Sequence, residues 1–111
     1  MDIVDFASPE IKEICEIERV AKRKLGAPCA KKLKTRLAEI VAAPFVTNLP
    51  AGKPHALDRE RTGQYAVSLE GLIRLCFEPA NSPIPRTPDG RVEWSKVNKV
   101  KIVDIVDYHD Y

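Results

Sequence analysis

Nine prolines divide this chain of 111 residues into segments that can and cannot form regular structure. Proline lacks a backbone N–H and is disfavoured inside helices and central strands. Only Pro28 interrupts residues 10–43, and no proline lies in residues 55–78 or 89–111. We therefore expect helices and strands in these three segments, and loops in the proline-rich stretches between them.

The first segment has the pattern of two amphipathic helices. Ser8 is placed to cap a helix that begins at Pro9, and Gly26 is placed to end it. A second helix opens at Pro28 and stops before Pro44. Each helix carries one apolar stripe, formed by Ile11, Ile14, Cys15, Ala21 and Leu25 in the first and by Ala30, Leu33, Leu37, Ile40 and Val41 in the second. The short link between them predicts an antiparallel helical hairpin.

The remaining segments have the patterns of strands. Residues 63–69 and 72–78 both alternate apolar and polar side chains. Glu70-Gly71 between them has the composition of a turn, so the two runs predict a β-hairpin. A further candidate strand, residues 2–7, precedes the helices.

The last candidate strand runs from about Asn98 to Val106 and is apolar on both faces near its end, as in a central strand. Residues 79–96 before it carry four of the prolines and predict a surface insertion, which we expect Trp94 to hold to the body. The order strand, helix, helix, strand, strand, strand predicts a single α+β domain over residues 1–111. We expect an antiparallel sheet with the helical hairpin packed on one face.

Composition excludes several classes of protein. Apolar residues make up 44% of the chain and charged residues 31%, which is typical of a globular domain. The start of the chain has no basic leader, and no apolar run approaches the roughly 20 residues of a membrane helix. Three scattered cysteines and two histidines predict neither a disulfide framework nor a metal site. We expect a cytoplasmic protein that uses no metal or other cofactor and does not act on a membrane.

The net charge of +2 conceals a basic block in residues 19–36. This block holds eight cationic residues, Arg19, Lys22, Arg23, Lys24, Lys31, Lys32, Lys34 and Arg36, and no acidic residue. The rest of the chain therefore sums to 2 − 8 = −6. A charge run is often only a solvated helix surface, but a block without interspersed carboxylates also suits a polyanion such as nucleic acid.

Several polar residues have the types that metal-independent RNA cleavage requires. The reaction needs a base for the ribose 2′-hydroxyl, an acid for the leaving 5′-oxygen, and cations for the phosphate. Histidine, arginine and tyrosine supply proton transfer, phosphate binding and base stacking. These types occur at His55, Arg61, Arg74, Tyr108 and His109. If the last strand lies beside the hairpin, they converge on one surface; otherwise the C-terminal pair is a solvated tail.

Four segments resemble HigB-type toxins of the RelE/ParE superfamily. Residues 52–67 (GKPHALDRERTGQYAV) are similar to the His-x-Leu…Arg-x-Gly-x-aromatic pattern of that family. Residues 74–81 (RLCFEPAN) resemble the Arg-Leu-x-Phe strand of its killer proteins, and residues 83–97 resemble a subgroup insertion. Residues 107–109 (DYH) are similar to the terminal motif. Together these segments follow the family order over nearly the whole chain.

The resemblance implies a RelE-like β-α-α-β-β-β fold and a ribosome-dependent mRNA endoribonuclease that cuts codons in the A site of the 30S subunit. Such a protein is the toxin of a type II toxin–antitoxin system and inhibits translation. The resemblance also implies a HigA-like antitoxin with a helix-turn-helix domain. Toxin and antitoxin together would act on their operator DNA.

The resemblance also implies roles for individual residues. The catalytic candidates are His55, Asp107, Tyr108 and His109, and the phosphate-binding candidates are Arg61, Arg74 and Lys53. The implied surface for ribosomal RNA consists of Arg19, Lys22, Arg23, Lys31, Lys32, Lys34 and Arg36.

One departure from the family pattern leaves alternatives open. The family often has Lys-Gly after His-x-Leu, where this chain has Asp58-Arg59. A carboxylate at that position would repel phosphate, although Arg59 could substitute for the cation. The chain could therefore be an attenuated member that only binds antitoxin and DNA, or a ParE-like gyrase inhibitor, since function depends on the site and not the fold.

Overall fold

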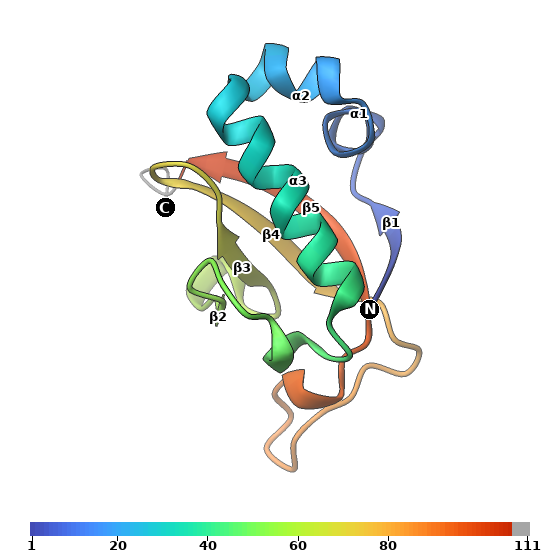
Figure 1. Ribbon diagram of the computed structural model, residues 1–111. Helices are drawn as coiled ribbons and strands as arrows, with labels where there is room; N and C mark the ends of the chain where they lie inside the picture. Colours follow the sequence, from blue (N-terminus) through green and yellow to red (C-terminus); the bar gives the residue numbers. More distant parts are fainter. Residues whose placement is uncertain (108–111) are drawn as a thin grey trace.

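In the computed structural model, which describes residues 1–107, α3 crosses one face of a five-stranded sheet (Figure 1). The helical elements are α1 (Pro9–Glu16), α2 (Glu18–Leu25) and α3 (Ala27–Ala42), with short 3-10 turns η1 (Val46–Asn48), η2 (Arg59–Arg61) and η3 (Trp94–Lys96). The strands are β1 (Asp2–Phe6), β2 (His55–Ala56), β3 (Tyr65–Ser68), β4 (Ile73–Pro79) and β5 (Lys99–Asp107). The predicted α+β class is confirmed. None of the described helices is long and apolar enough to span a membrane.

The sheet has the strand order β1-β5-β4-β3-β2. Antiparallel pairing joins β2 to β3, β3 to β4 and β4 to β5, so the predicted hairpin of β3 and β4 is confirmed. The prediction of an antiparallel sheet is wrong for β1, which lies parallel to β5 and makes the sheet mixed. Apolar alternation fixes which side chains of a strand face the core, but it does not fix the direction of a strand that no turn links to its neighbour.

The first predicted helix is in fact two helices. Ile17 has an extended backbone (φ −117°, ψ 108°) that ends α1 and starts α2. The break lets α1 pack on β1 and β5 while α2 packs on α3, and Figure 1 shows α1 nearly end-on beside α2. Ile17 is neither glycine nor proline, so the sequence pattern carries no signal for the break. Gly26, with φ 83°, makes the predicted turn from α2 into α3.

The main core lies between the helices and one face of the sheet. Leu33 and Ile40 of α3 are almost fully buried, as are Val67, Leu75, Phe77, Val100 and Ile102 of the sheet. Burying one such side chain contributes about 1.5–3 kcal/mol to folding. The insertion is held to this core by Trp94, whose ring centroid lies 4.8 Å from that of Tyr65, so the predicted anchor is confirmed.

Candidate functional site

The face of the sheet opposite the helices, here called the open face, carries a row of side chains from four strands. His55 pairs with Ala66, Ala66 with Cys76, and Cys76 with Asp104. Residues that pair directly across neighbouring strands project from the same face of a sheet. Because the neighbours of Ala66 and Cys76 along each strand face the helices, this row projects from the open face.

A small apolar cluster forms the floor of the open face. It consists of Leu57, Ala66 and Cys76, with Val103 and Val106 packed against them. Ala66 and Cys76 are fully buried, and Leu57, in the segment after β2, packs in the same cluster. The cluster gives the polar groups around it a fixed support.

Arg61 reaches across this floor from η2 to β5. Its Nη2 donates to Oδ2 of Asp104 at 2.7 Å, and its Nη1 donates to Oε1 of Gln64 at 2.9 Å. A β-bulge in β5 makes the arrangement possible, since Cys76 lies opposite Asp104 whereas Phe77 lies opposite Ile102. The extra residue changes the direction in which the side chains of β5 project, an effect that is common for bulges next to functional sites. The two contacts fix the plane of the guanidinium group at the open face.

His55 lies at the edge of the open face, in β2. Its Nδ1 is 2.8 Å from the carbonyl oxygen of Lys53. A carbonyl oxygen can only accept, so Nδ1 is the donor in this contact. The backbone of Lys53 is left-handed (φ 48°), and the Lys53 side chain is exposed. In a neutral ring with its proton on Nδ1, Nε2 is the atom that could act as a general base.

Arg74 of β4 belongs to the next row of the open face. It pairs with Ser68 of β3 and Val106 of β5, and its Nη1 donates to the carbonyl oxygens of Gly71 and Ile73 at 3.2 Å each. Side-chain alternation places Arg74 on the same face as Cys76, two residues along the strand. The structure therefore brings His55, Arg61 and Arg74, all predicted from the sequence, to one face.

The remaining predicted catalytic residues are Asp107, Tyr108 and His109. Asp107 ends β5 in register with Ile73, whose side chain packs on the helix-side core, so strand alternation does not place Asp107 on the open face. Its side chain is exposed at the end of the sheet. Tyr108 and His109 lie outside the described residues.

The basic block divides into an exposed set and one buried residue. The exposed cations on α2 and α3 are Arg19, Lys22, Arg23, Lys24, Lys31, Lys32 and Lys34. The assignment of Arg36 to this surface is wrong, because Arg36 is 9% exposed and pairs with Glu39 at 2.8 Å. Its Nε also donates to the carbonyl oxygen of Ser68 at 2.9 Å. Leu33 and Ile40 lie three and four residues from Arg36 and share its face of α3. This spacing was the sequence signal from which the buried position of Arg36 could have been predicted.

Asp104 is the main residue of the open face that the sequence patterns missed. It stands among apolar residues of β5, a strand paired on both sides. A carboxylate in such a strand needs a cationic or hydrogen-bonding partner, and this requirement was an available signal for the pair with Arg61. Among residues 1–107, no three His, Cys, Asp or Glu side chains form a group that could hold a metal ion.

Burial sets the protonation of the thiols near the helices. It raises the pKa of Cys15 to about 12, with a smaller contribution from the charge of Glu16. Burial also raises the pKa of Cys29. Neither thiol therefore supplies a nucleophile at neutral pH. No protein-family model and no curated protein matches this sequence.

Proposed function

We propose that this protein is a toxin of a type II toxin–antitoxin system that cleaves mRNA on the ribosome without a metal ion. The observation that carries the proposal is the presence of His55, Arg61 and Arg74 on one open face of the sheet. These residues supply a candidate base and two phosphate-binding guanidinium groups, which are two of the three parts that phosphodiester cleavage through a ribose 2′-hydroxyl requires. None of the three is needed to fill the main core.

The proposed mechanism assigns a role to each group. Nε2 of His55 takes the proton of the 2′-hydroxyl, which attacks the adjacent phosphorus. Arg61 and Arg74 bind the phosphate oxygens and stabilise the charge that grows on them in the transition state. On the resemblance of the C-terminal motif alone, we assign protonation of the 5′-oxygen to His109 and stacking on a base to Tyr108. The resemblance, and not the strand register, also assigns support of the acid to Asp107 and binding of a flanking phosphate to Lys53.

The partners in this proposal follow from charge and from the resemblance. The exposed cations of α2 and α3 would bind ribosomal RNA and present the open face to mRNA in the A site. A helix-turn-helix antitoxin of the HigA kind would neutralise the toxin, and the complex would bind operator DNA. The protein would act in the cytoplasm.

The test is to map mRNA 5′ ends shortly after induction of the wild type, His55→Ala and His109→Ala. Lys12→Ala is the matched control, because Lys12 is an exposed cation on α1, far along the chain from the open face. New 5′ ends inside translated codons, present in the wild type and control and absent in both histidine variants, would support the proposal.

Two other results would replace the proposal. Intact messages with arrested growth and DNA damage would indicate a gyrase inhibitor. Intact messages with normal growth would indicate an attenuated member that only binds antitoxin and DNA, as the exposed carboxylate of Asp58 beside the site suggests.

A further inference from the structure

Arg36 of α3 is a buried charged residue that bonds to the backbone of the sheet. Its Nε donates to the carbonyl oxygen of Ser68 in β3 at 2.9 Å, and its Nη1 donates to Oε1 of Glu39 at 2.8 Å. Burying an arginine is costly, and a buried ion pair often stabilises a fold no more than apolar residues of similar size would. The position of Arg36 therefore points to a use other than stability.

Gly52, in the loop before β2, lies directly against the Arg36 side chain. A Cβ added at Gly52 would lie 2.6 Å from Nε of Arg36 and 3.2 Å from its Cδ and Cζ, so a glycine is needed for this close approach. The amide of Ser68 donates to the carbonyl oxygen of Gly52 at 2.7 Å. Gly52 is therefore held by a hydrogen bond from Ser68 and by packing against Arg36.

The next residue, Lys53, connects this contact to His55. Lys53 has a left-handed backbone (φ 48°), as Gly52 does (φ 85°). This conformation is unfavourable for a residue with a side chain and persists where the surrounding structure holds it. The carbonyl oxygen of Lys53 accepts from Nδ1 of His55 at 2.8 Å. A continuous chain of contacts thus runs from Arg36 through Gly52 and Lys53 to the imidazole ring.

We propose that Arg36 is a positioning residue for His55, because it fixes the backbone of residues 52–53 so that the Lys53 carbonyl holds the imidazole ring in one orientation. A guanidinium group suits this use, since it is planar and donates in fixed directions to a carboxylate and a carbonyl at once. A lysine lacks the fork, and an apolar residue lacks the donors. This assignment rests on the proposed function, in which His55 is the base.

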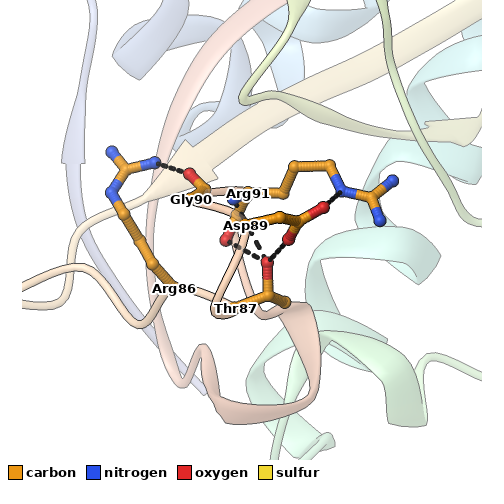
Figure 2. A network of polar contacts seen from close by, with 5 residues as sticks. All are labelled: Arg86, Thr87, Asp89, Gly90 and Arg91. Atoms are coloured by element: carbon orange, nitrogen blue, oxygen red, sulfur yellow. Dashed lines mark hydrogen bonds and ion pairs between the residues drawn. The ribbon is translucent and has the colours of Figure 1, made fainter.

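The insertion supplies a matched control for Arg36. Nε of Arg91 donates to Asp89 at 2.8 Å in the hydrogen-bonded turn drawn in Figure 2. Within residues 1–107, the hydrogen bonds of the Arg91 side chain stay inside this turn. Arg91→Met therefore removes a guanidinium–carboxylate pair, as Arg36→Met does, but removes no bond to the loop that holds His55.

The test measures the tautomer of His55 by nitrogen-15 NMR of the full-length protein labelled in its two histidines, at about pH 8, where histidine rings are neutral. His109→Ala assigns the signals. We expect the wild type to carry the proton on Nδ1, which donates to Lys53. Arg36→Met should lower the ratio of the Nδ1–H to the Nε2–H tautomer about threefold or more, because that hydrogen bond is weakened. Arg91→Met should leave the ratio unchanged.

Two further variants separate positioning from a general loss of stability. Ile40→Val removes a buried methylene from the same face of α3 and should leave the tautomer ratio of His55 unchanged. Glu39→Ala removes the carboxylate that orients the Arg36 guanidinium and should lower the ratio. An unchanged ratio in Arg36→Met, or in Glu39→Ala if Arg36→Met does not fold, would overturn the assignment. An equal fall in Ile40→Val or Arg91→Met would overturn it too.

Cleavage by the same variants separates this assignment from the proposed function. Arg36→Met should cleave mRNA on the ribosome at least about tenfold more slowly than the wild type, because a displaced base is poorly aligned with the 2′-hydroxyl. Cleavage at the wild-type rate despite a changed ratio would overturn the assignment. A changed ratio with no cleavage by the wild type would uphold the positioning of His55 and refute the nuclease. An unchanged ratio with cleavage by the wild type would do the reverse.

Discussion

The two faces of the sheet differ in the side chains they carry: one face is almost entirely apolar, and the other combines a small apolar floor with polar groups. Toward the helices, Val67, Leu75, Phe77, Val100 and Ile102 are nearly inaccessible and pack against an equally apolar helix stripe. On the open face, the buried floor is made of small and medium-sized side chains, and an arginine, an aspartate and a histidine lie over and beside it.

The comparison shows which face the fold depends on. The free energy of folding comes mainly from the helix side, where most of the apolar area is buried. The Arg61–Asp104 pair on the open face is partly exposed, and such pairs typically contribute only about 0.2–1 kcal/mol. The polar groups of the open face can therefore be changed with little cost to the stability of the fold.

The largest expected effect is on the helix side. Phe77→Ala should lower the free energy of unfolding by about 3–5 kcal/mol, because it leaves a cavity in a fully buried site. Urea denaturation followed by circular dichroism measures the change. Val106→Ala, in the floor of the open face, is the comparison and should cost clearly less because Val106 is only partly buried. Equal losses would break the distinction between the faces.

Arg61→Gln should lower activity strongly and stability only slightly. The substitution removes a guanidinium that the proposed mechanism uses on the transition state, so ribosome-dependent cleavage should fall about 100-fold. The free energy of unfolding should change by no more than about 1 kcal/mol. Single-turnover cleavage and urea denaturation of the same preparation give both values. A large loss of stability with normal cleavage would make Arg61 a structural residue.

A smaller effect is expected where Arg36 joins α3 to the sheet. An added Cβ at Gly52 would lie 2.6 Å from Nε of Arg36, and Gly52 also has a positive φ of 85°. Gly63 shares the positive φ (93°) but has nothing within 4 Å, so Gly63→Ala reports the backbone cost alone, about 1–2 kcal/mol. Thermal unfolding should show Gly52→Ala to be the less stable variant. Equal melting temperatures for the two variants would mean that the Arg36 side chain moves aside without lowering stability.

The smallest effect concerns the cysteines, which lie on both sides of the sheet. Because burial raises the pKa of Cys15 to about 12, little thiolate exists at pH 8. Its alkylation should be at least about tenfold slower in the native protein than in the unfolded chain, where thiols ionise near pH 8.5. Mass spectrometry after timed labelling assigns each site. Faster labelling of Cys76 than of Cys29 would show that the open face opens more readily than the helix side.

Much of the fold could be predicted from the sequence because it depends on local patterns. Proline positions, the turn at Glu70-Gly71 and the stripes of the helices specify elements through neighbouring residues alone. The break at Ile17 and the parallel direction of β1 could not be predicted, because each is set by packing between segments far apart in the chain. Local patterns do not encode such contacts.

The candidate site, like the fold, could be predicted from the sequence only in part. Residue type and motif spacing pointed to His55, Arg61 and Arg74, and strand register explains why they share a face. The role of Asp104 depends on a bulge in β5, which apolar alternation does not reveal. Arg36 was wrongly assigned to the surface because the prediction considered its charge and not its position on the buried face of α3. Arginine can be buried when it pairs with carboxylates and carbonyls.

The central claim is that the open face carries out RNA cleavage and is not required for folding. The most direct measurement is cleavage of a defined mRNA by the purified protein with purified ribosomes, comparing the wild type with His55→Ala at equal, measured stability. The account predicts cleavage within the A-site codon for the wild type and at least about a 100-fold slower reaction for the variant. Cleavage by His55→Ala at the wild-type rate, or no cleavage by a folded wild type, would contradict it.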